Sequence, residues 1–155
     1  MIEERLSLEN SDEKVMVTGA TAFSLYMHNA EKLAAATGLS YGDIIVLRHL
    51  HGRRDEINLR TLKENVMMLS GASITKITDK LVQKGYIHRR ENPKSRREKL
   101  IKITQNGEKA FARLNKEIST LNEKAVKGFS SADKNSLFSD MKVILTNMFN
   151  VGIED

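Results

Sequence analysis

Residues 70–104 read SGASITKITDKLVQKG and then YIHRRENPKSRREKLIKIT, and this stretch decides the fold. Its first part predicts an exposed polar helix. Ser70 can cap that helix, because a serine hydroxyl can accept a hydrogen bond from a backbone N–H two or three residues on. Ile74 and Leu81 fall on one helical face and predict a buried stripe. Gly85 then ends the helix where a left-handed backbone is favoured.

The second part of the stretch predicts a β-hairpin with a long loop. Residues 86–90 and 100–103 are runs rich in β-branched side chains with partial alternation of apolar and polar residues. Asn92 and Pro93 supply the turn between them, and Pro93 is the single proline of the chain. Thr104 can cap the helix that follows.

The charge of the chain is concentrated on this hairpin. Residues 84–102 include eight Lys or Arg and two Glu, which gives a local net charge of +6, whereas the whole chain carries +5. A basic hairpin beside a polar helix, on a body that is otherwise nearly neutral, is the pattern expected for binding a phosphate backbone. The alternative interpretation of a charge run alone is a solvated surface.

Composition limits the class of protein. A chain of 155 residues with 40% hydrophobic and 29% charged residues predicts one domain that can bury a core. The absence of cysteine excludes disulfides and thiolate metal ligands and is compatible with a reducing cytosol. We expect no signal peptide, no membrane span and a cytoplasmic location. No P-loop, dinucleotide fingerprint, His-Glu-x-x-His or nucleophile elbow occurs, so we predict neither an enzyme nor a cofactor.

Amphipathic helices flank the central stretch. Periodic apolar residues predict a long helix from Asp12 to a stop at Gly38, a shorter one from Ser40 to near Gly52, and one from Asn58 to about Ser70. Ile57 is expected in a very short strand. After the hairpin, a helix with an apolar seam at Phe111, Leu114, Ile118, Leu121 and Ala125 precedes a last helix capped by Ser130 or Ser131. Their exposed seam predicts a two-fold dimer interface.

In its order of elements the chain resembles the winged helix-turn-helix regulators of the MarR family, the multiple-antibiotic-resistance repressors. The motif residues that carry the resemblance are Leu62, Val66, Ser70, Ile74, Leu81, Gly85, Arg90, Arg96, Arg97, Ile103, Thr104 and Gly107. The resemblance implies a mainly α fold with a small β-hairpin wing. It implies one domain over residues 1–155, with a DNA-binding lobe at 40–104 and helical dimerisation regions at 11–38 and 105–150.

The resemblance also implies a homodimer that binds a pseudo-palindromic double-stranded DNA operator, most simply as a repressor. The recognition helices would enter successive major grooves and the wings the flanking minor grooves. On the helix we predict DNA contacts by Gly71, Ala72, Ser73, Thr75, Lys76 and Lys80. On the wing we predict contacts by Arg90, Lys94, Arg96, Arg97 and Lys99. Lys76 is the candidate donor to guanine, Arg96 the candidate for minor-groove insertion, and Lys80 a phosphate contact.

A small-molecule effector pocket is the family's commoner regulatory device, between the dimer helices and the DNA-binding lobe. The residues expected to line it are Phe23, Tyr26, Met27, His28 and Arg48, each of which is also an ordinary core or surface residue. Two alternatives stay open. His28 and Glu31 at helical spacing allow a zinc-dependent co-repressor, although we predict no metal site, and the winged helix can serve as a protein–protein adaptor.

Overall fold

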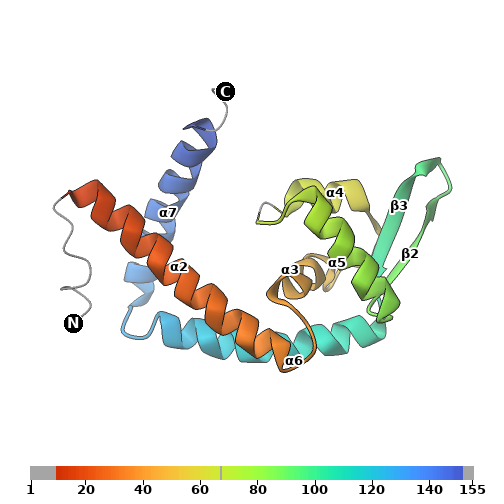
Figure 1. Cartoon of the computed structure of the whole chain (residues 1–155), viewed down its shortest axis with the longest axis horizontal. Helices are drawn as coiled ribbons and strands as arrows, with labels where there is room; N and C mark the ends of the chain where they lie inside the picture. Colours follow the sequence, from red (N-terminus) through yellow and green to blue (C-terminus); the bar gives the residue numbers. More distant parts are fainter. Residues whose placement is uncertain (1–9, 67, 152–155) are drawn as a thin grey trace. The chain divides into compact units, whose positions relative to one another are not determined.

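The computed structural model describes residues 10–66 and 68–151, apart from the side chains of residues 96 and 97. The expected absence of a signal peptide concerns a segment, residues 1–9, that lies outside the described residues. The elements are α2 (Ser11–Ala35), α3 (Tyr41–Leu50), β1 (Ile57–Asn58), α4 (Leu59–Asn65), α5 (Gly71–Gln83), β2 (Ile87–Asn92), β3 (Ser95–Ile103), α6 (Gln105–Ala125) and α7 (Ser131–Val151) (Figure 1). The predicted fold class, mainly helical with a β-hairpin wing, is confirmed.

The chain divides into two compact units, residues 1–121 and residues 122–155, each described by itself below. The first unit carries the polar helix and the basic hairpin of residues 70–104. The predicted boundaries of the DNA-binding lobe and of the dimerisation helices stay predictions. Among the described helices, none combines the length and the apolar character that crossing a membrane requires.

Local capping fixes the starts of the helices, as predicted. At α3, the Ser40 hydroxyl accepts a hydrogen bond from the Asp43 N–H at 3.1 Å, and the Asp43 carboxylate accepts one from the Ser40 N–H at 2.7 Å. Asn58 caps α4, Ser70 caps α5 through the N–H of Ser73, and Thr104 accepts from the N–H of Gly107. These bonds satisfy N–H groups that the first turn of a helix leaves without partners.

The helix predicted from Asn58 to about Ser70 ends earlier than expected, and this prediction was wrong. The last residue of α4 is Asn65, and Val66 leaves the helix with φ −98° and ψ 86°. The Val66 side chain is nevertheless buried, as is Leu62 one turn before it. Burial of Val66 therefore accounts for the apolar periodicity without requiring that the helix continue.

The hairpin forms as predicted and gains a third strand. β2 and β3 pair antiparallel, with Arg90 opposite Leu100, and the register is irregular between Glu91 and Asn92. β1 pairs with the other edge of β3, with Ile57 opposite Ile101, so the order in the sheet is β1-β3-β2. Arg90 and Arg89 are thereby held on an edge strand beside α5 (Figure 1).

The core of the first unit includes part of the seam that we had assigned to dimerisation. Phe111, Leu114 and Ile118 of α6 are buried in one cluster with the core residues of α3, α5 and the sheet. That part of the seam is therefore not available to a partner, and the interpretation of the whole seam as exposed was wrong. Leu121 is only partly buried against the same core, and Ala125 is exposed.

In the second unit, α7 is capped as predicted but has no buried residue. The Ser130 hydroxyl accepts from the Asp133 N–H at 3.1 Å, and the Asp133 carboxylate accepts from the Ser130 N–H at 2.8 Å. These hydrogen bonds hold the pKa of Asp133 below its ordinary value. The apolar stripe of α7 is exposed, with Phe138 at 68%, Met141 at 53% and Met148 at 53%.

Candidate nucleic-acid interface

The helix α5, which we predict to be the recognition helix, has one buried face and one polar face. Ile74, Thr78 and Leu81 are fully buried, and this stripe anchors the helix to the core. Gly71, Ala72 and Lys76 are exposed, while Ser73 and Thr75 are half-buried. Short side chains near the start of the helix leave room for a groove wall, and Lys76 carries an ammonium group that is unpaired among the described residues. The predicted base-contacting residues thus share an accessible face.

The hydroxyl groups of this face are partly engaged within the helix. The Thr75 hydroxyl donates to the carbonyl of Gly71 at 3.0 Å, and the hydroxyls of Ser70 and Ser73 lie 2.9 Å apart. A hydroxyl that donates locally keeps lone pairs, so Ser73 and Thr75 can still accept from a base edge. Lys76 is the side chain on this face with free donors, which makes it the strongest candidate for direct readout.

The wing carries its cations on β2, the turn and β3. Lys94 is exposed at the turn, where its backbone N–H donates to the Asn92 side chain at 3.0 Å. Arg96 and Arg97 lie in β3. Their side chains are outside the described part of the structure, so the predicted minor-groove and backbone contacts of these two arginines stay predictions.

Several wing cations are paired with carboxylates, which the charge count alone did not reveal. Arg90 donates from Nε to both carboxylate oxygens of Glu56, at 2.9 and 3.0 Å, and also pairs through Nη2. This guanidinium holds the pKa of Glu56 below its ordinary value. Lys99 donates to Glu91 at 2.8 Å, and that ammonium lowers the pKa of Glu91 in the same way.

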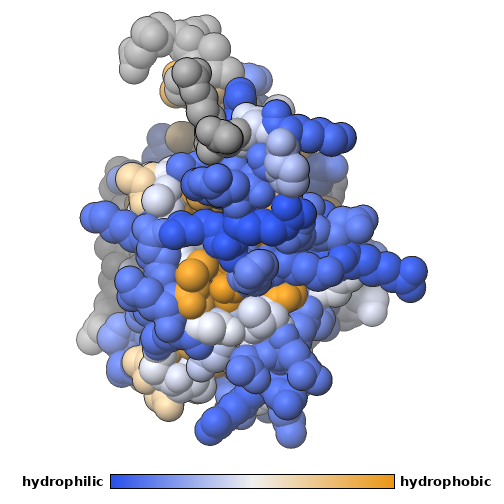
Figure 2. Space-filling view, turned by 90° about the vertical axis from the view of Figure 1, so that its right-hand side faces the viewer, coloured by the Kyte–Doolittle hydropathy of each residue, from blue (hydrophilic) through white to orange (hydrophobic). Residues whose placement is uncertain are grey.

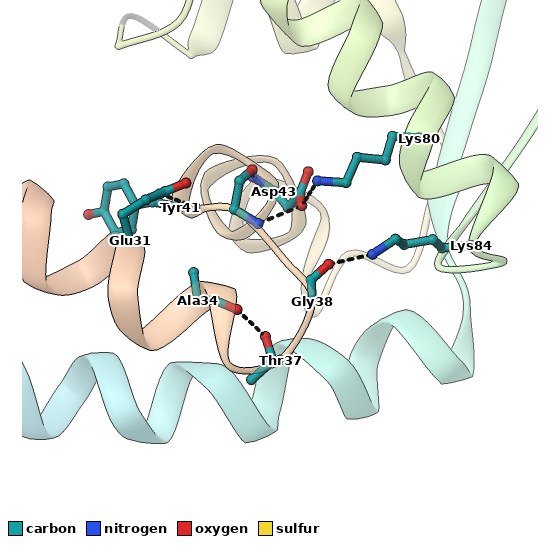
Figure 3. Close-up of polar contacts among 9 residues, drawn as sticks. Glu31, Ala34, Thr37, Gly38, Tyr41, Asp43, Lys80 and Lys84 are labelled. Atoms are coloured by element: carbon teal, nitrogen blue, oxygen red, sulfur yellow. Dashed lines mark hydrogen bonds and ion pairs between the residues drawn. The ribbon is translucent and has the colours of Figure 1, made fainter.

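Two further cations form ion pairs with carboxylates of helices. Arg89 pairs with Asp79 and so joins β2 to α5, a contact that the sequence analysis did not identify. Lys80 pairs with Asp43 on α3 (Figure 3). We predicted that the Lys80 ammonium group contacts a DNA phosphate. In the structure this group is instead paired with a buried carboxylate. Of these two contacts, only that of Arg89 could have been suggested by the sequence, because Arg89 follows closely after the glycine that ends α5.

The side of the molecule on which β2 and β3 lie in Figure 1 is largely hydrophilic, with a small hydrophobic area near its centre (Figure 2). Polar and charged side chains spread over this face suit contact with a charged, hydrated ligand better than burial against an apolar partner.

The five predicted effector residues are only partly brought together. The Tyr26 hydroxyl lies 3.3 Å from the Tyr41 hydroxyl, and the rings pack edge to face with centroids 6.1 Å apart. Burial is the main cause that raises the pKa of Tyr26, so this phenol stays neutral, and the nearby positive charge of Arg48 acts in the opposite direction. Met27 is half-buried, whereas Phe23 and His28 are exposed on α2.

Arg48 lines a shallow hollow on the surface. It donates to the Asn115 side chain at 3.1 Å, and the hollow, of about 390 Å³, is also lined by His49, His51, Gly52 and Arg53. That hollow does not include Phe23, Tyr26, Met27 or His28. The predicted effector-binding residues therefore stay a prediction.

Glu31, one of the two residues of the alternative zinc site, already makes a contact within the protein. Its carboxylate accepts a hydrogen bond from the Tyr41 N–H at 2.7 Å (Figure 3) and so supports the first turn of α3. Within the described residues, no group of three or more His, Cys, Asp or Glu is arranged to hold a metal ion.

Part of this arrangement matches a family of known proteins. The MarR family model matches residues 39–99, which run from the turn before α3 into β3. A search of curated proteins finds no match to the chain. Solved structures match across most of the chain at low identity, and they share its fold.

Two of these structures contain DNA. Sco3205, a MarR family transcriptional regulator from Streptomyces coelicolor in complex with DNA, is 15% identical, with a TM-score of 0.80 over 90% of this chain and 89% of that chain. A mutant of MarR from E. coli complexed with operator DNA is 18% identical, with a TM-score of 0.73 over 88% of this chain and 99% of that chain.

A third structure contains a small molecule. CouR from Rhodococcus jostii RHA1, bound to p-coumaroyl-CoA, is 19% identical, with a TM-score of 0.76 over 88% of this chain and 95% of that chain. The predicted resemblance is therefore confirmed: residues 39–99 match the MarR family model, and the chain shares the winged-helix fold of MarR-family structures.

Proposed function

We propose that this protein is a sequence-specific regulator of transcription that binds double-stranded DNA as a homodimer and acts as a repressor. The observation that carries the proposal is the accessible polar face of α5, with the free ammonium group of Lys76, beside a basic hairpin. Phosphate contacts from the wing would set the position of the protein, and α5 would read base edges in the major groove. The DNA in the structures of Sco3205 and of the E. coli MarR mutant supports this proposal.

A homodimer is supported by apolar side chains that the chain leaves exposed. On α7 these include Phe138, Met141 and Phe149, at 52–68% exposure, and on α2 they include Met16 and Phe23, at 47% and 52%. Apolar side chains left exposed along a helix favour burial against a partner. Two-fold symmetry would then place the recognition helices about 34–36 Å apart, in successive major grooves of a pseudo-palindrome.

We further propose that a small-molecule effector releases the DNA. A ligand can do so only if it binds a splayed arrangement of the recognition helices better than the DNA-competent one. The residues proposed to line its site are Phe23, Tyr26, Met27, His28 and Arg48. The paired hydroxyls of Tyr26 and Tyr41 offer neutral donors and acceptors, and Arg48 offers a cation. The p-coumaroyl-CoA bound to CouR supports this mode of regulation.

Selection of fragments from a random duplex pool by the purified protein tests the proposal. A pseudo-palindromic consensus with half-sites about one helical turn apart is the expected result. Enrichment of no sequence, both with and without added zinc, would contradict sequence-specific regulation and favour the protein–protein adaptor. Enrichment only with zinc would support the co-repressor alternative instead.

The ion pair between Glu91 and Lys99 makes a separate prediction about the wing. Replacing Glu91 with glutamine frees the Lys99 ammonium, so we expect affinity for a random duplex to rise by up to about tenfold at 0.1 M salt. The logarithmic salt slope should steepen by about one unit, as for one added phosphate contact. Fluorescence anisotropy at several salt concentrations measures both quantities.

Glu117→Gln is the control for this experiment, because it removes the same charge from the exposed surface of α6. A small rise in affinity without a change in slope is expected for the control. If both variants behaved alike, the gain would come from net charge, and Lys99 would not be a phosphate contact.

A further inference from the structure

One face of the recognition helix is seated on the turn that joins α2 to α3. Ile77 and Lys80 are three residues apart and so lie on the same side of α5, and Lys84, the C-cap of this helix, follows four residues later. The Lys80 ammonium donates to the Asp43 carboxylate, and the Lys84 ammonium donates to the carbonyl of Gly38 (Figure 3). This set of contacts differs from the buried stripe of Ile74, Thr78 and Leu81.

The approach of the two helices is close at Gly42. A Cβ added there would lie 2.9 Å from Cδ1 of Ile77, which is shorter than an ordinary contact. The backbone of the first turn of α3 therefore packs closely against the Ile77 side chain of α5. A larger residue at position 42 would push that side chain aside. The contact brings Asp43 within reach of Lys80.

Asp43 is the buried member of the ion pair. Its side chain is completely buried, whereas that of Lys80 is 40% exposed. One oxygen, Oδ2, accepts from the Ser40 N–H at 2.7 Å and from Lys80, while Oδ1 has no hydrogen-bond partner among the described residues. A buried carboxylate that loses its cation is left with an uncompensated charge, so this pair resists separation.

The other side of the same turn is tied to α2. The Tyr41 N–H donates to Glu31 at 2.7 Å, and the Thr37 hydroxyl donates to the carbonyl of Ala34 at 2.7 Å (Figure 3). The Leu39 N–H donates to the same carbonyl at 3.2 Å. A continuous set of polar contacts thus runs from α2 through the turn to the face of α5 that carries Lys80.

We infer that Asp43 and Lys80 are positioning residues, which fix the orientation of the recognition helix against the turn between α2 and α3. Lys80 would then act through α5, in place of the phosphate contact predicted from the sequence. This inference rests on the proposed DNA-binding function, because its consequence is a correctly angled α5 in the major groove. Through the same contacts, a conformational change in α2 would alter the orientation of α5.

A double-mutant cycle with Asp43→Asn and Lys80→Met tests the inference. Each single variant should lower affinity for the selected operator by about tenfold or more, and affinity for a random duplex by less than about threefold. The double variant should bind the operator no more weakly than the weaker single variant, because removing both charges leaves no buried ion unpaired. The salt slope of Lys80→Met should equal that of the wild type.

Two further variants keep the test decisive. Lys80→Arg retains the charge and should hold operator affinity within about threefold of the wild type. Lys76→Met removes a charge from the same helix and should lower operator affinity without coupling to Asp43→Asn. A Lys80→Met variant that lost affinity for both duplexes and one unit of salt slope, with Asp43→Asn unaffected, would identify a phosphate contact and overturn the inference.

Hydrogen exchange of the α5 backbone amides in free protein separates this inference from the proposed function. Faster exchange is expected in Asp43→Asn and in Lys80→Met, and the effect in the double variant should be smaller than the sum of the two single effects. That pattern would support the positioning pair even if the wild type selected no operator. Failure of the wild type to select an operator would refute only the proposed regulation of transcription. Unchanged exchange in both single variants would refute the positioning pair.

Discussion

Replacing Gly107 with alanine should lower the free energy of unfolding by about 3 kcal/mol, as overpacking of a rigid site does. Gly107 is buried in the first turn of α6, and a Cβ at this position would lie 2.1 Å from the carbonyl oxygen of Tyr86 and 2.8 Å from Cγ1 of Ile103. The Tyr86 carbonyl is fixed, because it also accepts from the Thr104 N–H at 3.0 Å. Relief of the clash therefore requires movement of backbone at the base of the wing.

Urea denaturation of the two proteins measures the loss, and Gly71→Ala is the matched control. A Cβ at Gly71 would meet its nearest atom, Cδ of Lys63, at an ordinary distance of 3.6 Å. We expect this control to change the free energy of unfolding by less than about 1 kcal/mol. Equal stabilities for Gly107→Ala and the wild type would show that α6 does not press against the wing as described.

Truncation of Lys76 to alanine should reduce specific binding to the selected operator by about ten- to hundredfold, as expected for the loss of one base contact. Lys76 is exposed on α5 and is unpaired among the described residues, unlike Lys80. Its donors are therefore free to reach guanine O6 or N7. Binding to a random duplex should fall much less, so the ratio of specific to non-specific affinity is the quantity to measure.

Lys116→Ala controls for the lost charge, since Lys116 is exposed on α6. This control should lower the two affinities by a similar small factor and leave their ratio unchanged. If Lys76→Ala also left the ratio unchanged, Lys76 would be a phosphate contact or no contact, and base readout would have to be assigned to other residues of α5.

Features that depend on neighbouring residues could be predicted from the sequence. Ser40, Asn58, Ser70 and Thr104 cap helices with side chains that reach only two or three residues along the chain, so their chemistry is visible in the sequence. Gly85 has φ +69°, the left-handed conformation expected for a glycine that ends a helix. Such local rules were enough to place the recognition helix and the wing.

Contacts between distant residues could not be predicted in this way. Glu56 and Arg90 are separated by 34 positions, and Asp43 and Lys80 by 37, so only the tertiary fold brings each pair together. An amphipathic period likewise indicates that one face of a helix is buried, but not what covers it. Phe111, Leu114 and Ile118 were accordingly assigned to a dimer seam, although the chain buries them in its own core.

The most direct test of the account is a titration of the selected operator and a random duplex with purified protein, at about 50 and 200 mM salt. We expect two protomers per operator, a specificity ratio of at least about 10³, and affinity for both duplexes that falls steeply with salt. Equal, weak affinity for both duplexes, with or without zinc, would contradict a regulator that reads DNA sequence through α5.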